Sequence, residues 1–305
     1  MSIVVFGSLN MDLVVRTPRF PQVGETIIGH TFSTFPGGKG ANQAVACARL
    51  GAKTFMVGRV GEDAFWKSLR LELEASGVHL QYVNVDRESS SGIALITVDQ
   101  FAENTIIVIP GANGRINHID IENLKKALDG ATHLLVQLEI PLDMVLEAAQ
   151  LAFNRSIPVM LDPAPAKDLP KDLYKVIDLI TPNESEAELL VGFPIKTQQD
   201  AVDASRLLLN RGVKRVVIKM GSQGAFAADN HIEKFYPAIP VKAVDSVAAG
   251  DSFNAALAVA QSEGKSFEES VLWGVAAGAL SVTKEGAQQS MPERSDLERL
   301  LVEIN

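Results

Sequence analysis

The chain has 305 residues, 47% of them apolar and 21% charged, which is enough to bury a large core and excludes a disordered, collagen-like or disulfide-stapled protein. Its formal net charge is −9, from 28 Lys and Arg against 37 Asp and Glu, and the sequence has no basic run that would bind nucleic acid. The single cysteine, Cys47, cannot form a disulfide within the chain, so we expect a reducing, cytoplasmic location. We expect no targeting peptide and no membrane span, because the longest nearly apolar stretch, residues 271–282, is too short for a bilayer.

Short β-branched runs alternate with longer segments of helical periodicity along most of the chain. The expected strands are residues 3–6, 134–138, 158–161, 179–180 and 215–219, and the expected helices between them include residues 144–153, 184–190 and 198–210. In these helices apolar residues recur at i, i+3, i+4 and i+7. The alternation predicts an α/β fold built from βαβ units, with a mostly parallel sheet flanked by helices.

Two regions break this alternation. Residues 13–16 and 26–32, and later residues 92–98 and 105–109, are β-branched runs with no helix between them. They predict a small second β-sheet, formed within about residues 11–36 and 91–110. Because no tandem repeat, low-complexity tract or Pro/Gly-rich linker divides the chain, we expect a single domain over residues 1–305.

A glycine-rich segment comes before a helix of small residues at residues 36–51. Its three glycines, at positions 37, 38 and 40, allow a ligand to approach the backbone at a helix N-terminus, where Lys39 and Asn42 offer hydrogen-bond donors. The alternative is that the glycines form a plain turn and the alanines only pack tightly. The segment is not a Walker A loop, and no G-x-G-x-x-G follows the first strand, which argues against dinucleotide binding.

The segment around Asp251 also combines a turn with a helix start. Helical spacing of apolar residues begins at Phe253, which places residues 248–251 at a helix N-terminus, where free N–H groups and the helix dipole favour an anion. On this segment alone the preferred interpretation of Asp251 is an N-cap, for which Asp is well suited. The alternative is a general base that takes a proton from an attacking hydroxyl beside a bound phosphate.

Other polar residues also follow expected strands. Glu184 and Glu186 are acids in the first turn of an expected helix, where they complement the helix dipole; the alternative is that Asn183 and Glu186 organise Mg²⁺ through water. The glycines of residues 219–224 form either a hairpin turn or a close approach to a nucleotide. Asn10 and Asp12 follow the first strand, at the end of an open parallel sheet where ligands collect.

The order of these motifs resembles the ribokinase family of sugar and nucleoside kinases, which includes fructokinases and adenosine kinase. The matching segments are Gly7-Ser-x-Asn-x-Asp, Gly37-Gly-Lys-Gly-Ala-Asn-Gln-Ala, Thr181-Pro-Asn-Glu-x-Glu-Ala-Glu, Gly221-Ser-x-Gly and Asp245-Ser-Val-Ala-Ala-Gly-Asp-Ser-Phe-Asn. The resemblance runs from Ile3 to about Pro292. It implies a Rossmann-like domain with a small β lid, and transfer of the ATP γ-phosphoryl group to O5 of D-ribose. The alternatives are a kinase for 2-deoxyribose, another pentose or ketose, or a nucleoside, and a non-catalytic sugar-binding regulator.

The resemblance also implies a role for each matching residue. The sugar contacts are Asn10, Asp12, Gly38, Lys39, Asn42, Glu139 and Asp251, and Asp251 is the general base. The N–H groups of Ala248, Ala249 and Gly250 form an anion hole. The nucleotide contacts are Asn183, Lys219, Gly221, Ser222, Gly224, Gly250 and Val275. Glu186 acts on Mg²⁺ through water, and an activating monovalent cation, usually K⁺, is bound by Asp245, Val247, Ser281, Lys284, Gly286 and Ser290.

Four positions depart from the family pattern, and the first, Ser246, stands where Thr is common before the anion hole. Lys219 stands where many members have Thr or Ser, Val275 where some have a His against adenine, and Trp66 where Gly is common. The apolar lid strands, at residues 13–15 and 105–109, predict a homodimer through the lid, because pairing with a second subunit covers exposed strand edges.

Overall fold

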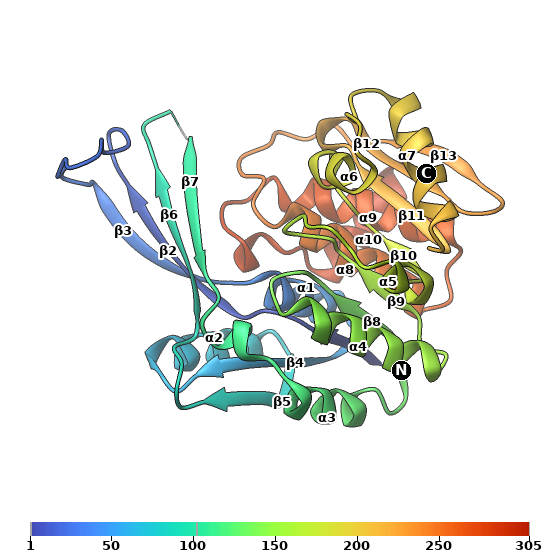
Figure 1. The fold of residues 1–305 in the computed structure, drawn as a ribbon. Helices are drawn as coiled ribbons and strands as arrows, with labels where there is room; N and C mark the ends of the chain where they lie inside the picture. Colours follow the sequence, from blue (N-terminus) through green and yellow to red (C-terminus); the bar gives the residue numbers. More distant parts are fainter. Residues whose placement is uncertain (1, 102, 305) are drawn as a thin grey trace.

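The computed structural model describes residues 2–101 and 103–304, which form two sheets and the helices around them (Figure 1). In the described residues the strands of the large sheet, from one edge to the other, are β13 (Glu233–Pro237), β12 (Gly224–Ala228), β11 (Arg215–Lys219), β10 (Leu179–Ile180), β9 (Val159–Leu161), β8 (Ala131–Val136), β1 (Ser2–Phe6), β4 (Lys53–Gly61) and β5 (His79–Asp86). The strands from β11 to β5 run parallel, whereas β12 and β13 add an antiparallel edge. The predicted fold class is confirmed.

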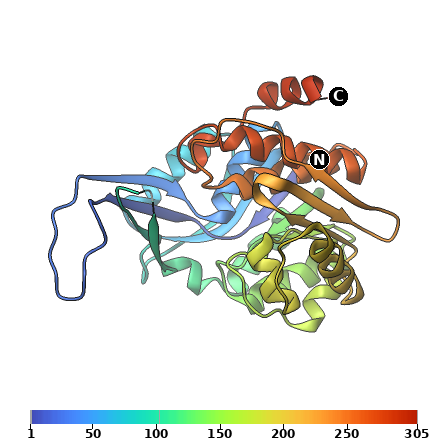
Figure 2. The same cartoon turned by 90° about the horizontal axis from the view of Figure 1, so that it is seen from above.

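The small sheet projects to one side of the large one (Figures 1 and 2). Its strands, in spatial order, are β3 (Thr31–Gly37), β2 (Asn10–Arg16), β6 (Gly92–Val98) and β7 (Asn104–Ile109). The strand predicted at residues 26–32 was wrong in its bounds, since β3 begins only at Thr31. Thr31 pairs with Arg16, the last residue of β2, so the residues before Thr31 lie beyond the end of their partner strand.

Helices cover both faces of the large sheet. One core lies under α1 (Lys39–Arg49), α2 (Ala64–Ala75), α8 (Ala249–Ser262), α9 (Phe267–Ser281) and α10 (Arg294–Ile304), and the other under α3 (His118–Ala127), α4 (Leu142–Asn154), α5 (Lys171–Val176), α6 (Glu184–Val191) and α7 (Gln198–Asn210). Short 3₁₀ turns are η1 (Gly111–Arg115), η2 (Gly221–Gln223) and η3 (Gln288–Ser290). In β1, Ile3 and Val5 enter the first core and Val4 and Phe6 the second, as expected for a strand buried on both faces. No helix in the described ranges is both long and apolar enough to cross a bilayer.

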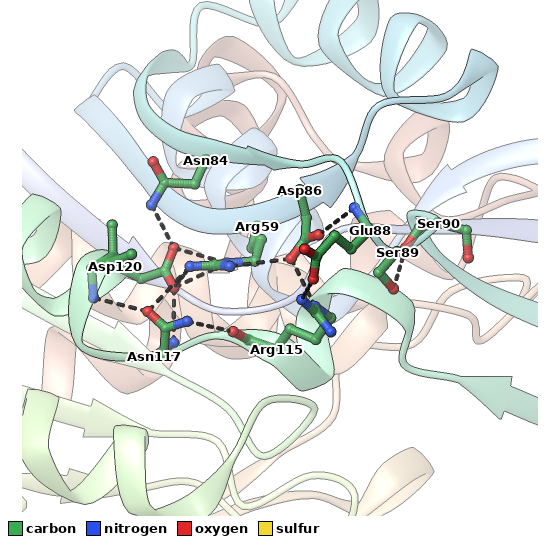
Figure 3. Close-up of polar contacts among 10 residues, drawn as sticks. Arg59, Asn84, Asp86, Glu88, Ser89, Ser90, Arg115, Asn117 and Asp120 are labelled. Carbon is green, nitrogen blue, oxygen red and sulfur yellow. Dashed lines mark hydrogen bonds and ion pairs between the residues drawn. The ribbon is translucent and has the colours of Figure 1, made fainter.

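A buried ion network holds the base of the small sheet to the large one (Figure 3). Arg59 of β4 donates to Asp86 at 3.1 Å and to Asp120 of α3 at 2.8 Å, and Arg115 of η1 donates to the same Asp86 at 2.9 Å. Because the side chains of Asp86 and Asp120 are only 5% and 0% exposed, their charges depend on these partners. The network therefore fixes the two segments that lead into β6 and out of β7.

Candidate active site

Asp251 lies at the start of α8, but it does not cap the helix. The N-cap is Ala248, which has left-handed backbone angles (φ 59°) and no side-chain cap, and Asp251 is the third helical residue. Its carboxylate instead accepts hydrogen bonds from helix α1, at 3.0 Å from Asn42 Nδ2 and 3.1 Å from Gln43 Nε2. The N-cap interpretation of Asp251 is therefore wrong, and the carboxylate points toward α1.

A second carboxylate, Asp162, joins the same cluster. Gln43 Nε2 also donates to Asp162 Oδ2 at 3.0 Å, and Gln137 Nε2 donates to Gln43 Oε1 at 2.7 Å. Lys219 Nζ forms a 3.0 Å ion pair with the other oxygen of Asp162. The sequence reasoning missed Asp162 and Gln43. Asp162 directly follows β9, and its place at the C-terminal end of a parallel strand is the signal by which it could have been found.

The contacts expected for the sugar come together at the junction of the two sheets. Glu139 accepts a hydrogen bond from the backbone N–H of Lys39 at 3.0 Å and another from the Ser8 hydroxyl. Asp12 lies against Gly37, where a Cβ atom would come within 2.5 Å of its carboxylate. Gly38 has φ 89°, and a Cβ there would lie 2.6 Å from the backbone nitrogen of Asn10, so only glycine allows this approach.

The charges of this junction act on one another. Burial raises the pKa of Asp12 to about 7, with further contributions from Glu139 and Asp251. Burial also raises the pKa of Asp251 to about 6, opposed by Lys39 and by the hydrogen bonds it accepts. Burial alone would lower the pKa of Lys39, but Asp251 and the other carboxylates around it reverse the effect and raise it. The charge of Lys39 thus offsets part of the repulsion among the carboxylates around it.

Asn183 and Glu186 form a capping box at the start of α6. The backbone N–H of Asn183 donates to Glu186 Oε2 at 2.8 Å, and the backbone N–H of Glu186 donates to Asn183 Oδ1 at 2.8 Å. These reciprocal hydrogen bonds give both residues a local role in capping α6. Burial raises the pKa of Glu186, and nearby Lys219 opposes this rise, so the carboxylate also belongs electrostatically to the cluster around Asp162.

The residues expected to contact a nucleotide differ in how accessible the structure leaves them. A Cβ atom at Gly250 would lie 3.3 Å from Lys219 Nζ, so the ammonium lies beside the first turn of α8. Gly221 and Gly224 have φ 49° and φ 119°, and Ser222 is exposed on the turn between them. A Cβ atom at Gly224 would also come within 2.0 Å of the Tyr236 carbonyl, which is a packing reason for this glycine. Val275 is only 7% exposed, and its side chain packs in the core under α9, which leaves little surface for an adenine ring.

The anion hole expected at residues 248–250 is only partly free. The Ala249 N–H donates to the Ser246 carbonyl at 3.3 Å, so one of the three expected donors already has a partner. The first turn of a helix nevertheless leaves backbone N–H groups without intrahelical acceptors. The turn before α8 therefore retains an electropositive end directly beside Asp251.

The residues expected to bind a monovalent cation gather beyond this turn. Asp245 accepts hydrogen bonds from the N–H groups of Val247 and Gly286, both at 3.0 Å. The hydroxyl oxygens of Ser281 and Ser290 are buried and lie 2.9 Å apart, and the N–H of Lys284 donates to the Ser281 carbonyl at 3.2 Å. Carboxylate, hydroxyl and carbonyl oxygens retain free lone pairs after one hydrogen bond, so this donor set fits a hard cation.

Glu186 is the residue expected to act on a magnesium ion. The described residues contain no group of three His, Cys, Asp or Glu side chains arranged to hold a metal ion. Glu186 supplies a buried carboxylate, and that burial raises its pKa. Mg²⁺ is commonly bound by one or two carboxylates together with water and substrate phosphates, and Glu186 fits that mode.

Comparison with known proteins identifies the family. The model of the pfkB family of carbohydrate kinases matches residues 1–294. The ribokinase of Bacillus subtilis is 40% identical over 302 residues, covering 98% of this chain and 99% of its own, and the deoxyribokinase of Salmonella typhi is 36% identical over 293 residues, covering 96% of each chain. The solved structure of Arabidopsis thaliana ribokinase complexed with ribose and ATP has 37% identity, a TM-score of 0.92 and 98% coverage of both chains. The chain belongs to the pfkB family of carbohydrate kinases.

Proposed function

We propose that this protein transfers the γ-phosphoryl group of ATP to O5 of D-ribose, with Asp251 as the general base. The observation that carries the proposal is the placement of Asp251: it is 4% exposed, lies in the first turn of α8 and is oriented by two side-chain amides of α1. The likeness to curated ribokinases and to the Arabidopsis structure supports ribose as the acceptor.

In this proposal Asp251 holds the proton released by the attacking hydroxyl. Each of its oxygens accepts one amide hydrogen and keeps a lone pair for that proton. A pKa of about 6 leaves Asp251 ionised at neutral pH. This pKa is also close enough to pH 7 for the carboxylate to accept a proton as the reaction proceeds. Asn10, Asp12, Gly38, Lys39, Asn42 and Glu139 would bind the sugar and aim its hydroxyl at Asp251.

Phosphoryl transfer requires alignment and charge stabilisation more than covalent chemistry. The N–H groups of Ala248 and Gly250 would bind the transferred phosphoryl, and that of Ala249 would join them by exchanging its 3.3 Å hydrogen bond to the Ser246 carbonyl; each well-placed donor contributes about 3–4 kcal/mol in comparable sites. Lys219, beside Gly250, would meet the nucleotide phosphates, with Asn183 and the turn of residues 221–224 along the nucleotide.

Two metal ions would complete the charge balance. Mg²⁺, positioned through water by Glu186, would neutralise the phosphates, and K⁺, held by Asp245, Ser290 and the neighbouring oxygens, would strengthen the positive field of the anion hole. The protein residues would bind and orient the sugar and the nucleotide, and the two cations would supply positive charge.

We infer that residues 1–305 act as one domain with the small sheet as a lid. Two of its strands meet the large sheet beside the sugar contacts, since β2 starts at Asn10 and β3 ends at Gly37. A lid at this place would exclude water, which otherwise competes with the sugar as phosphoryl acceptor.

We also infer a homodimer that forms through this lid. β7 is an edge strand, and its residues Ile106, Ile107, Val108 and Ile109 are 41–63% exposed. Pairing with a second copy would cover the edge and these apolar side chains. Light scattering of the wild type and of Ile107→Lys tests this proposal; a wild-type monomer contradicts it.

A cytoplasmic location follows from the proposed chemistry, because the reaction needs ATP. The thiol of Cys47 is buried, and burial raises its pKa, so it is protected from oxidation and metal binding. Fractionation of cells that express the protein tests the location.

The central experiment is a substrate panel of D-ribose, 2-deoxyribose, other pentoses and nucleosides, with ADP release as the readout. We expect the highest kcat/KM with D-ribose. Asp251→Asn should keep the fold and the affinity for ribose, and lower kcat by roughly 10²- to 10⁴-fold. An unchanged kcat contradicts the general base, and no turnover with any acceptor favours a sugar-binding regulator.

2-Deoxyribose is the second candidate acceptor. The Salmonella typhi deoxyribokinase resembles this chain almost as closely as the ribokinases do, at 36% identity. A kcat/KM for 2-deoxyribose above that for ribose would assign the chain to that activity.

A further inference from the structure

Asn113, which no sequence motif singled out, lies buried beneath the expected sugar contacts. It belongs to η1, directly after the lid strand β7, and is 1% exposed. Its Oδ1 accepts from the N–H of Leu9 at 3.0 Å, and its Nδ2 donates both to the Leu9 carbonyl at 3.0 Å and to Asn10 Oδ1 at 2.7 Å. All of its amide atoms are engaged by two consecutive residues.

These contacts determine which way both amides face. A backbone N–H only donates and a carbonyl only accepts, so Leu9 fixes the orientation of the Asn113 amide. The Nδ2 atom of Asn113 therefore faces Asn10, and Asn10 must turn its Oδ1 toward it. The Nδ2 atom of Asn10 then lies in the same amide plane on the other side of the Cβ–Cγ bond, away from Asn113.

We propose that Asn113 is a positioning residue that fixes the Asn10 amide so that Asn10 offers Nδ2, a donor, to a hydroxyl group of the sugar. The inference rests on the proposed function, in which Asn10 contacts the sugar. Asn113 itself touches no substrate in this proposal. Its effect is to decide whether the sugar meets a donor or an acceptor.

Gly92 provides an independent sign that this contact is built into the fold. Gly92 of β6 pairs with Asn10 of β2, and a Cβ atom at Gly92 would lie 2.2 Å from both Asn10 Oδ1 and Asn113 Nδ2. A side chain there would therefore push the two amides apart. The amide pair fits because position 92 carries no side chain.

The same contact links sugar recognition to the lid. The Ala112 N–H donates to the Ser90 carbonyl at 2.8 Å, so the turn that carries Asn113 is held to the segment entering β6. A Cβ atom at Gly111 would lie 2.4 Å from that same carbonyl, which shows how closely the two segments pack. The orientation of Asn10 thus depends on the contact between the segment that enters β6 and the turn that follows β7.

The test is Asn113→Asp, which preserves size but replaces the donor with an acceptor. The aspartate still accepts from Leu9 N–H, but it also draws Asn10 Nδ2 toward itself and turns Asn10 Oδ1 toward the sugar. We expect the Kd for ribose, measured by calorimetry without nucleotide, to rise by about 10- to 100-fold, and the KM for ATP to change less than twofold. Asn123→Asp is the matched control. Asn123 lies on α3, where its Nδ2 donates to Asn84 Oδ1 of β5 at 3.1 Å, and the variant should leave the ribose Kd unchanged.

A double-mutant cycle separates positioning from general damage to the fold. In the Asn10→Ala background the further change Asn113→Asp should alter the ribose Kd by less than twofold, because no amide remains to be turned. Gly92→Ala, which removes neither amide, should raise the Kd in the wild type and again have little effect with Asn10→Ala. Losses that multiply in the double variants overturn this inference alone. A ribose Kd unchanged by Asn10→Ala overturns both the inference and the sugar contact of the proposed function.

Discussion

Asp162 and Asp251 share one hydrogen-bond donor, the Nε2 atom of Gln43, which lies 3.0 Å from an oxygen of Asp162 and 3.1 Å from an oxygen of Asp251. Both hydrogens of that nitrogen are used, and the Oε1 atom of Gln43 is held by Gln137. Because Asp162 raises the pKa of Asp251 while Gln43 lowers it, the amide offsets part of the repulsion between the two carboxylates.

Gln43→Leu should therefore shift the pH dependence of the reaction. The base must be ionised, so activity falls as the pH drops through the pKa of Asp251, which is about 6. Loss of a donor to the charged form raises this pKa further, and the acid limb of kcat/KM should move up by about one pH unit. The control is Gln199→Leu, which removes an amide bound to Asp203 on the surface of α7. An acid limb that stays in place shows that Gln43 does not support the base.

Asp12→Asn should stabilise the protein at alkaline pH. The folded-state pKa of Asp12 is about 7 against an ordinary value of 3.8, so the folded state retains a proton that the unfolded state loses between these pH values. Stability from this group is present below about pH 4 and is lost as the pH rises through 7. At pH 8 the variant should exceed the wild type by about 1–3 kcal/mol in unfolding free energy, with little difference at pH 4.

Urea titrations at both pH values measure this effect. Asp143→Asn, an exposed change on α4, should show no such pH-dependent difference. The same Asp12→Asn variant should lose affinity for ribose, since the buried carboxylate is a sugar contact in the proposed function. An equal stability change at pH 4 and pH 8 contradicts the raised pKa.

Local patterns predicted the fold class, and the resemblance to the ribokinase family predicted which segments form the site. The turn and helix start at Asp251 and the glycines before α1 are signals that a single segment contains. The strand at residues 26–32 was placed too early because β-branched residues describe propensity, whereas pairing with Arg16 decides where β3 starts. The N-cap interpretation of Asp251 failed for a related reason, since the hydrogen-bond donors to Asp251 lie 208 and 209 positions away in the chain, at Gln43 and Asn42.

Long-range partners account for most of what the sequence left out. Asp162, Gln137 and Asn113 lie in no recognisable motif, and each acts through a residue that is distant in the chain. Their amide and carboxylate groups are common in loops after strands, so residue type alone does not separate them from solvent-exposed neighbours. Helix α1 brings Gln43 to Gln137 after β8 and to Asp162 after β9, whereas Asn113 reaches Asn10 from η1. These contacts exist only in the folded chain.

Lys219→Met should separate a structural role from a nucleotide role. The ion pair with Asp162 is buried, with side chains 14% and 3% exposed, so removal of the ammonium leaves an uncompensated charge and should cost about 3 kcal/mol. Asp162→Asn in the same chain should recover part of this loss. In the proposed function Lys219 also meets the phosphates, so the KM for ATP should rise at least about fivefold while the Kd for ribose stays within twofold.

The matched control is Lys214→Met. Lys214 pairs with Asp178 at 2.6 Å, but its side chain is 58% exposed. Its removal should therefore lower the unfolding free energy by less than about 1 kcal/mol and leave the KM for ATP and the Kd for ribose unchanged. A KM for ATP that does not change in Lys219→Met removes this lysine from the phosphate site.

Asp245→Ala should make the reaction indifferent to potassium. Asp245 ties the backbone of Val247, just before the anion hole, to Gly286 beyond α9, and its carboxylate is the charged member of the proposed cation site. Replacement of K⁺ by tetramethylammonium, which is too large and has no affinity for oxygen ligands, should depress kcat of the wild type. The variant should have the same lowered kcat in both salts, because the cation strengthens the anion hole only where Asp245 retains it. Glu285→Ala, at an exposed neighbouring acid, should keep the wild-type response. Equal wild-type rates in the two salts would remove the cation from the reaction, and a potassium response that survives in Asp245→Ala would place its site elsewhere.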